Sequence, residues 1–444
     1  MDAEPSEETR SSVKDTIFYG SIFAAITVVL LLPGFFYPPY FKAFKTLILV
    51  LIGLDFSRML LAGAFAFRKN DIPEEGYKPN VSIIIPAYNE GNVLRETVEA
   101  CVNLDYPKDK YEVVISYEGD STDNTPELAE ALADEFDIVK ALKSENPGGK
   151  AKAVNFALDH VDSEIIAGID ADHQFEEGAL KRAVRWFADE DVWCVRGRCY
   201  GRNPSGSILS LHATIERHLI ERIDVYGTYH FGGFSYYGGG QFFFRSKVFD
   251  EIGELGEDIL IEDIDMSAKI HKHGKELVID PEIVTYEQHP EEFANWWSQR
   301  VRWTRGWFQV AKRHLTDIIR SKNMSFRKRL DASFIMSYSM APPLLFMLVP
   351  LLAISTFLNY DTSPYVLKEA VIFGMTGVAN LAMISMLFLK DRMDGRKHHK
   401  KEYLSVLTLG YYYLLGGFVA VKAFIDEFIL SKENKFVVTK KHDS

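Results

Sequence analysis

The chain has 444 residues, a formal net charge of −12, three cysteines and 47% hydrophobic residues. The acidic balance argues against non-specific nucleic-acid binding, so we expect no nucleic acid among its partners. The cysteines show neither metal-ligand spacing nor even pairing, which indicates a reducing compartment without a disulfide framework. Membrane insertion stays open, because orientation in a bilayer depends on where lysine and arginine flank the apolar segments.

The amino-terminal part predicts two membrane-spanning helices. Residues 1–15 are polar and acidic, so we expect them to be disordered, and they lack the basic start of a signal peptide. Residues 17–36 and 47–67 are almost wholly apolar and long enough to span a bilayer. Asp55 and Arg58 lie three residues apart in the second segment, so we expect them to pair on one helix face.

The chain then changes to a soluble α/β pattern. Apolar strands at residues 81–85 and 111–116 end in polar turns, and helix-like stretches at 92–103 and 125–133 follow them. This alternation predicts a parallel sheet with right-handed crossovers. We expect three further strands and a helix, at residues 138–142, 164–169, 192–196 and 262–273.

The stretch IAGIDADHQF, residues 166–175, is the centre of the predicted site. A buried strand ends there in Asp170 and Asp172, and open α/β sheets bind ligands at the carboxyl ends of their strands. Mg²⁺ or Mn²⁺ takes one or two carboxylates from protein and completes its shell with waters and substrate phosphates. Alone the pair is weak evidence, because spaced aspartates also cap helices and turns.

Further polar clusters follow strand ends or open a helix. PAYNE (86–90), EGDSTD (118–123) and PGGK (147–150) could hold a nucleoside and a phosphate, although turn chemistry alone also explains each of them. Glu262 and Asp263 open a helix, either as a favourable N-terminus or as a general base that takes the proton of an attacking sugar hydroxyl.

Beyond Pro290 the chain becomes rich in tryptophan and arginine and then apolar. QRVRW (299–303) offers a guanidinium for a departing diphosphate and an indole for a sugar ring. The surrounding segment is suited to helices on an anionic membrane surface, or it is an ordinary solvated basic face. Three apolar blocks follow, at residues 334–358, 366–389 and 404–424.

The charges beside these blocks do not fix how the last block crosses the membrane. The basic loop at residues 391–401 predicts a cytoplasmic side, as does the basic run before residue 334. Five full spans would then put the basic tail, residues 431–444, outside. Either the block at 404–424 does not cross fully, or it is a hairpin broken near Gly416, or the tail disobeys the rule. We expect a cytoplasmic tail.

The motifs together resemble a known family. PAYNE, EGDSTD, GGKAKAVN, DADH, IED and QRVRW occur, over residues 81–309, in the order typical of the membrane-embedded family 2 glycosyltransferases. That group contains cellulose, chitin, hyaluronan and poly-N-acetylglucosamine synthases. FVVTKK (436–441) is similar to the F-x-V-T-x-K gating loop of cellulose synthases, and DADH and QRVRWTRG also look closest to that member.

The resemblance implies an α/β GT-A (Rossmann-like) catalytic domain in the cytoplasm, attached to an α-helical transmembrane region. The sequence departs from the family at one turn, where Tyr117 and Glu118 replace two adjacent aspartates, and Ile261 replaces the usual threonine. The expected parts are a disordered start (1–15), two spans (16–70), the GT-A domain (79–290), interfacial helices (291–330), carboxy-terminal spans (331–430) and a gating tail (431–444).

Roles for single residues follow from the motifs and the resemblance, with Asp263 as the base. The expected residues are Ala87, Tyr88, Glu90, Glu118, Asp120, Lys150 and Asp170 for the nucleotide sugar, Asp170 and Asp172 for Mg²⁺ or Mn²⁺, Glu262 and Asp263 for catalysis, Gln299, Arg302 and Trp303 for the acceptor and diphosphate, and Phe436, Thr439 and Lys441 for gating.

The expected function is a processive, inverting transfer of a sugar from UDP-glucose or UDP-N-acetylglucosamine to a growing polysaccharide. We expect the chain to be an integral membrane protein that also carries this polysaccharide across the lipid bilayer. An accessory export subunit is left open. One alternative is a non-processive transferase with a lipid acceptor. Another is a transporter whose soluble domain senses a nucleotide, which would not need Asp263 as a base.

Overall fold

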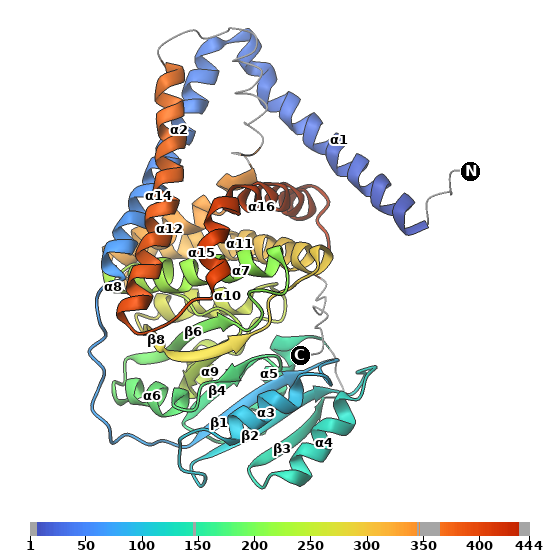
Figure 1. Cartoon of the computed structure of the whole chain (residues 1–444), viewed down its shortest axis with the longest axis vertical. Coiled ribbons are helices and arrows are strands. Elements are labelled where there is room, and N and C mark those ends of the chain that lie inside the picture. The colour runs from blue at the N-terminus through green and yellow to red at the C-terminus, as the bar shows by residue number, and fades with distance from the viewer. Residues whose placement is uncertain (1–6, 145–147, 344–345, 347–364, 435–444) are drawn as a thin grey trace.

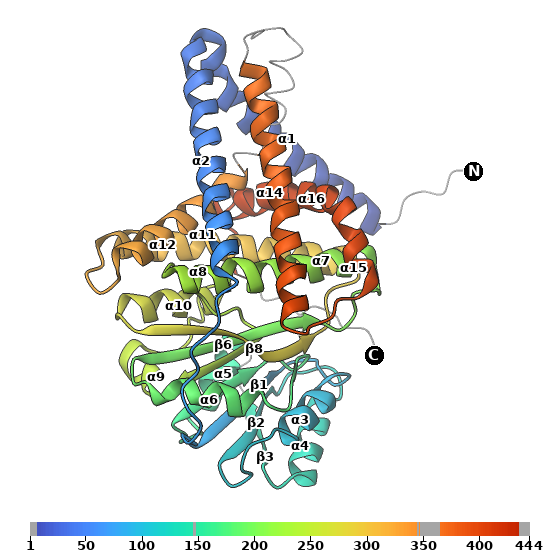
Figure 2. The ribbon, with the colours of Figure 1, turned by 60° about the vertical axis from the view of Figure 1, so that its left-hand side comes forward.

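The structure, a computed structural model, describes residues 7–144, 148–343, 346 and 365–434. Figure 1 shows three layers along the long axis of the molecule. A β-sheet with its flanking helices lies at one end, a layer of helices lies across it, and long helices rise from that layer (Figure 2). This arrangement confirms the predicted α/β domain joined to an α-helical region.

The sheet has eight strands in a mixed arrangement. Their bounds are β1 (Val81–Ala87), β2 (Tyr111–Glu118), β3 (Val139–Ser144), β4 (Ile165–Ile169), β5 (Gln174–Phe175), β6 (Val192–Gly201), β7 (Gln241–Arg245) and β8 (Glu276–Glu287). The spatial order is β3-β2-β1-β4-β7-β6-β8-β5. β1 to β4 are parallel, as predicted.

The sheet also contains two antiparallel strands, β5 and β7, which the prediction of a parallel sheet did not include. β7 runs antiparallel to β4 and to β6, and β5 runs antiparallel to β8. The reason is that the chain stays at one edge of the sheet between the end of β6 and the start of β7, so β7 must run back. As a result the glycines just before β7 lie beside the carboxyl end of β4, where Gly240 accepts a backbone hydrogen bond from Asp170 at 3.2 Å.

Both faces of the central strands are buried. Alternate residues of a strand point to opposite faces, so Ile83 and Ile85 lie in one apolar cluster while Ile84 and Ile166 lie in another. Burial on both faces explains why these strands read as continuous apolar runs in the sequence. The covering helices are α3 (Leu94–Val102), α4 (Thr125–Glu135), α5 (Lys150–Leu158), α6 (Ala179–Arg185), η1 (Trp186–Ala188), α9 (Lys247–Ile252) and α10 (Glu262–Lys272).

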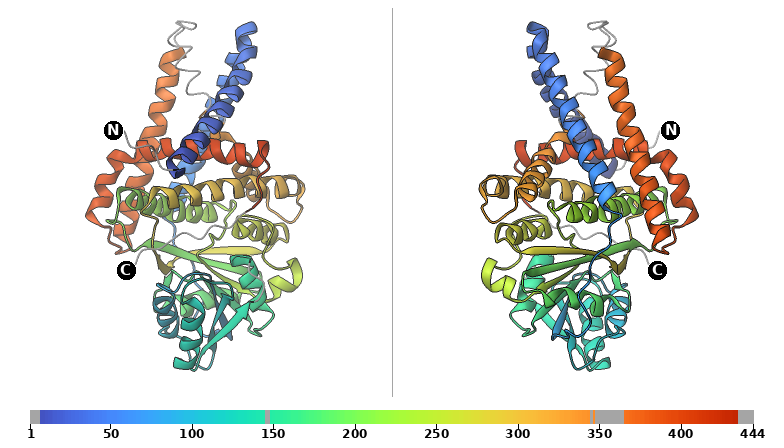
Figure 3. Two further views of the ribbon diagram at one scale, coloured as in Figure 1. Left: turned by 90° about the vertical axis from the view of Figure 1, so that its right-hand side faces the viewer. Right: turned by 90° about the vertical axis from the view of Figure 1, so that its left-hand side faces the viewer.

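Long helices form the end of the molecule opposite the sheet. Figure 3 shows α2 (blue) and α14 (orange) rising from the same face of the middle layer. The helices of the middle layer and of this end are α7 (Ile208–His218), η2 (Leu219–Val225), α8 (Tyr226–Phe231), α11 (Phe293–Arg320), α12 (Phe326–Tyr338), α1 (Glu7–Phe36), α2 (Pro38–Phe65), α14 (Tyr365–Met393), α15 (Lys400–Ser405), η3 (Val406–Thr408), α16 (Leu409–Phe424) and η4 (Ile425–Ile429).

The helical end differs from the expectations in two places. α1 begins at Glu7, inside the stretch 1–15 that the composition predicts to be disordered. The block at 404–424 is not one straight span, because α15 and η3 precede α16, and α16 lies across the molecule rather than along α2 (Figures 1 and 2). Among the described residues, two helical stretches are long and apolar enough to cross a membrane, Ile17–Gly34 and Lys400–Ile429.

Arg58 joins α2 to the middle layer. The charges of Arg58 and Asp55 interact, as expected, but the direct ion-pair partners of Arg58 are others: its guanidinium lies 2.6 Å from Asp224 Oδ1 and 2.7 Å from Asp331 Oδ1. The reason is that η2 and α12 present these carboxylates to α2, and a cation that is largely removed from water needs such partners. The contact joins α2 to η2 and α12.

Candidate active site

Four charged residues that are distant in the sequence meet at the carboxyl edge of the sheet. Lys150 opens α5, Asp170 follows β4, and Glu262 and Asp263 open α10. Lys150 Nζ lies 2.6 Å from Asp170 Oδ1 and 3.7 Å from Glu262 Oε1. It also donates a hydrogen bond to the carbonyl of Gly239 in the loop before β7. The structure therefore brings together the centre of the site that the sequence predicts.

Asp263 is held by backbone N–H groups. Its Oδ2 accepts a hydrogen bond from the Gly239 N–H at 2.7 Å, and its Oδ1 accepts one from the Ile264 N–H at 2.8 Å. Burial raises the pKa of Asp263, although these N–H groups and the charge of Lys150 act in the opposite direction. The result is an oriented carboxylate whose proton affinity exceeds that of an exposed aspartate, which suits a general base.

Glu262 has a different environment from its neighbour. It is 6% exposed and faces Lys150. Burial raises the pKa of Glu262, and Lys150 and Arg302 oppose that shift. Arg302, on α11, donates a hydrogen bond at 3.4 Å to the carbonyl of Leu260, just before α10. Glu262 is thus a charge partner of the two cations, whereas Asp263 is the carboxylate held at the Gly239 loop.

The loop after β4 presents a mixed set of metal ligands. Asp170, Asp172 and His173 each offer an atom within 4.8 Å of the others. Thr97 Oγ1 donates a hydrogen bond at 2.6 Å to the Ala171 carbonyl and so fixes the loop from α3. The two carboxylates fit a divalent cation such as Mg²⁺ or Mn²⁺, and His173 Nδ1 lies 2.9 Å from Asp172 Oδ1. Sequence reasoning missed His173, although it completes the DADH motif.

The expected nucleoside side is formed by loops that hold one another. The Asn89 side chain accepts a hydrogen bond from the Thr122 N–H at 2.7 Å, and Thr125 Oγ1 accepts one from the Glu90 N–H at 2.8 Å. PAYNE and EGDSTD therefore form one surface at the ends of β1 and β2. Ala87 ends β1 and is buried, Tyr88 follows it, and Asp120 is exposed.

Glu118 supports the glycine turn before Lys150. Its two carboxylate oxygens accept hydrogen bonds from the Gly149 N–H at 2.9 Å and the Gly148 N–H at 3.3 Å. Burial raises the pKa of Glu118, and these two N–H groups partly offset the shift. The position where the sequence departs from the family pattern therefore positions α5 and its first residue, Lys150.

α11 covers the other side of the site. Arg302 reaches the loop before α10, Gln299 is half-buried, and the Trp303 ring lies 4.3 Å from the Arg300 guanidinium. Gln309, which sequence reasoning missed, accepts a hydrogen bond from the Leu260 N–H at 3.1 Å and donates one to Asn434 Oδ1 at 2.9 Å.

The start of the carboxy-terminal tail is therefore anchored beside the loop that precedes α10. Asn434 also donates a hydrogen bond to the Asp258 carbonyl at 2.8 Å. The expected gating residues lie outside the described residues; they are Phe436, Thr439 and Lys441.

Comparison with known proteins gives the family of this domain. Residues 82–253 match the family model described as Glycosyl transferase family 2. The chain is 32% identical over 263 residues to a beta-monoglucosyldiacylglycerol synthase of Nostoc sp., a match that covers 58% of this chain and 55% of that protein. It is 26% identical over 353 residues to a poly-beta-1,6-N-acetyl-D-glucosamine synthase of Staphylococcus epidermidis, covering 78% of this chain and 82% of that protein.

A solved structure agrees with this assignment at the level of fold. A mannosyltransferase from Pyrobaculum calidifontis, in complex with GDP-Man and Mn²⁺, aligns with a TM-score of 0.56 at 22% identity, over 80% of this chain and 98% of that chain. The expected closeness to cellulose synthase stays a prediction. The chain is therefore a glycosyltransferase enzyme that contains a family 2 domain with a GT-A fold.

Proposed function

We propose that the protein transfers a sugar, with inversion at the anomeric carbon, from a nucleotide-diphosphate donor to an acceptor hydroxyl. The observation that carries this proposal is the position of Asp263, which is half-buried, held by the Gly239 and Ile264 N–H groups, and adjacent to the Lys150–Asp170 pair. Asp263 takes the proton of the acceptor hydroxyl as that oxygen attacks the donor sugar. A single displacement of this kind needs no covalent sugar–enzyme intermediate.

Fixed positive charge supports the departure of the nucleotide diphosphate. Burial acts to lower the pKa of Lys150, but Asp170 and Glu262 outweigh it and raise that pKa, so the ammonium stays charged. Arg302 lies on the other side of Glu262 and adds a second cation. Charges that are already oriented cost no reorganisation when negative charge develops on the leaving group.

A divalent cation fits the ligand set of the loop after β4. Asp170 and Asp172 would hold Mg²⁺ or Mn²⁺, because both carboxylates lie in this loop and these ions prefer oxygen ligands. When bound, the cation would neutralise the diphosphate of the donor. The Mn²⁺ in the solved mannosyltransferase complex supports this assignment.

The acceptor we propose is a growing polysaccharide, built from UDP-glucose or UDP-N-acetylglucosamine and carried across the membrane. The poly-N-acetylglucosamine synthase of Staphylococcus epidermidis supports a polymer, because its similarity extends over 78% of this chain and so beyond the family 2 domain. The anchoring of the tail next to α10 by Gln309 and Asn434 is consistent with a segment that covers the donor.

We propose an integral membrane protein whose catalytic domain faces the cytoplasm. The apolar stretch Ile17–Gly34 and the basic loop at residues 391–401 support this orientation. The exposed apolar side chains of α1 and α2 would face lipid, among them Val29 at 68% exposure and Leu54 at 51%.

A second candidate acceptor is a lipid that receives one sugar. The relative of highest identity among those described above, the Nostoc protein, is a beta-monoglucosyldiacylglycerol synthase, and its match covers 58% of this chain. The charged centre of the site serves either acceptor, so only the product separates the two candidates.

The test is transfer by the purified full chain in lipid nanodiscs with Mg²⁺ or Mn²⁺. UDP-glucose, UDP-N-acetylglucosamine, UDP-glucuronate and GDP-mannose are offered singly, with and without diacylglycerol, and nucleotide release is recorded with product size. We expect one UDP-sugar to give a long polymer, and Asp263→Asn to give none. One sugar per diacylglycerol would establish the second candidate. If neither the wild type nor Asp263→Asn transfers a sugar, and both bind the nucleotide equally well, the result would favour the sensing transporter.

A further inference from the structure

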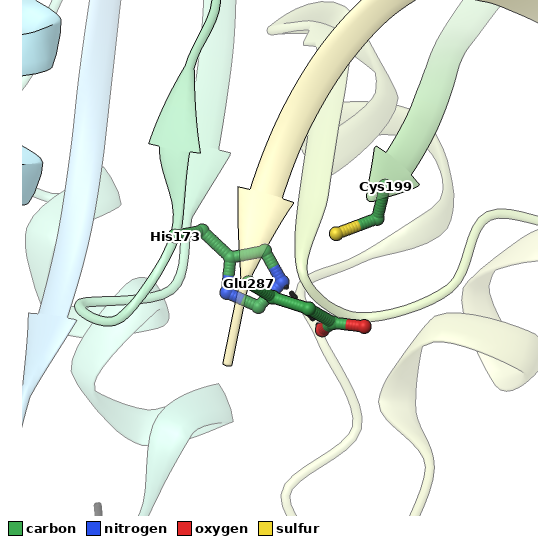
Figure 4. A group of neighbouring side chains, drawn as sticks. All are labelled: His173, Cys199 and Glu287. Carbon is green, nitrogen blue, oxygen red and sulfur yellow. Dashed lines mark ion pairs between the residues drawn. The ribbon is translucent and has the colours of Figure 1, made fainter. Parts of the chain in front are cut away.

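Three buried side chains lie together behind the Asp170–Asp172 loop. They are Cys199 at the end of β6, Glu287 at the end of β8 and His173 just before β5 (Figure 4). Each offers an atom that lies within 4.8 Å of the other two. We propose that these residues form a second metal site that binds Zn²⁺, distinct from the donor-binding site.

The sheet register brings the three residues together. Cys199 pairs with Thr285, Gly201 pairs with Glu287, and Gln174 pairs with Tyr286. β6, β8 and β5 are neighbours in the sheet, so their ends meet at one place. Ligands on adjacent strands are held by backbone hydrogen bonds, and such a site is preformed rather than assembled by the metal.

The His173 ring is oriented for a metal. Its Nδ1 lies 2.9 Å from Asp172 Oδ1, a contact that fixes the ring and its tautomer. Its Nε2 forms an ion pair with Glu287 Oε2 at 2.9 Å, outside the geometry of a regular hydrogen bond, and the side chain is only 4% exposed (Figure 4). A metal ion that binds here takes the place of the proton between these two atoms, beside the Cys199 thiol.

Glu287 presents one oxygen to this place. Its Oε1 lies 3.4 Å from Arg217 Nε and 3.4 Å from His289 Nδ1, which leaves Oε2 for the side of His173. Cys199 would bind as the thiolate, and its proton would pass to solvent as Zn²⁺ binds. Thiolate and carboxylate together balance the two positive charges of the ion, so its burial leaves no net charge.

The ligand chemistry favours Zn²⁺ over the donor-site cation. Mg²⁺ prefers oxygen ligands, whereas one sulfur, one nitrogen and one oxygen form a borderline-soft set that selects Zn²⁺. Because His173 belongs to the loop that carries Asp170 and Asp172, bound Zn²⁺ would join that loop to β6 and β8. Its role is thus to hold the donor-site loop, and it needs no donor to bind.

The test uses Co²⁺ as a spectroscopic probe on the full chain in detergent, after chelator treatment. We expect one equivalent of Co²⁺ to produce a thiolate-to-cobalt charge-transfer band that Zn²⁺ then removes. Cys199→Ser should lose the band, while Cys194→Ser should keep it, because Cys194 is an equally buried cysteine on β6 outside the cluster. Absence of the band in the wild type, or its presence in Cys199→Ser, would overturn the proposal.

Two further measurements separate loss of the metal site from misfolding of a variant and from loss of transfer. X-ray absorption on wild type with Zn²⁺ should show one sulfur at about 2.3 Å, which requires no variant to fold; a shell of nitrogen and oxygen alone would contradict the site. Asp263→Asn should keep the cobalt band even though it loses transfer, because Asp263 is not among the three ligands. A band lost in Asp263→Asn would show that the metal and the reaction centre are one site, against the proposal.

Discussion

Lys150 Nζ and Asp170 Oδ1 lie 2.6 Å apart, and this ion pair joins the start of α5 to the end of β4. Lys150 is also the residue that faces Glu262 and the Gly239 carbonyl, so one ammonium contacts three segments of the site. Its charge compensates two carboxylates, Asp170 and Glu262, and under the proposed function it would also face the donor phosphates.

Lys150→Met should lower kcat/KM by at least about 100-fold, because it removes a fixed positive charge from the leaving-group side. Nucleotide release by the full chain in nanodiscs measures the effect. Lys140→Met is the matched control and should leave the rate unchanged, since Lys140 is exposed on the edge strand β3 and pairs with Glu112 of β2. Equal losses in the two variants would show that the effect of Lys150 is not local.

Asp263→Asn should abolish transfer by about 100- to 10,000-fold, the usual contribution of a general base. Glu262→Gln, at the adjacent position, should lose less, because Glu262 partners Lys150 and Arg302 rather than the acceptor. Circular dichroism and gel filtration verify that both variants fold. A larger loss in Glu262→Gln than in Asp263→Asn would exchange the two roles.

The rate should fall at acid pH along a limb set by Asp263. Burial raises the pKa of this carboxyl above the ordinary aspartate value, so the base is present above that raised pKa and is lost as the pH falls through it. The pH profile of kcat/KM measures the limb. Glu262→Gln removes a neighbouring negative charge and should move the limb to lower pH; a shift to higher pH would contradict this account.

Gly227→Ala should destabilise the protein, because α8 lies against the backbone of α2 at this residue. A Cβ at Gly227 would lie 2.0 Å from the Ala62 carbonyl oxygen, so one helix must move. We expect a loss of about 1–3 kcal/mol, read as a lower apparent Tm by tryptophan fluorescence. Gly53→Ala on α2 meets nothing within 4 Å and should be neutral or slightly stabilising. Equal Tm values for the two variants would contradict the close contact.

Much of the fold could be predicted from local patterns. β1, β2 and β4 are buried on both faces, so their apolar runs stand out, and turn residues mark their ends. β7 could not be predicted, because its aromatic residues follow three glycines in a stretch with no clear period. The partners of Arg58 were out of reach for another reason: Asp224 and Asp331 are brought to α2 only by the packing of distant helices.

The candidate site, too, could be predicted only in part from local patterns. Lys150, Asp170 and Asp263 each stand at a strand end or a helix start, so their convergence could be predicted from the order of the elements. The role of Glu118 could not, because its hydrogen bonds go to a glycine turn thirty residues later in the chain. The cluster of His173, Cys199 and Glu287 depends on the register of β6 and β8, which no local pattern encodes.

The orientation of α16 has a consequence for the count of membrane crossings. Tyr412 of α16 accepts a hydrogen bond from Trp296 Nε1 at 2.9 Å and donates one to Glu216 at 2.8 Å, so this helix rests on α11 and α7. Under the proposed membrane arrangement, a helix bound in this way would lie along the membrane surface, and the five expected crossings would become four. The start of the tail, up to Asn434, would then lie on the side of the catalytic domain, in keeping with the hydrogen bond from Asn434 to the Asp258 carbonyl.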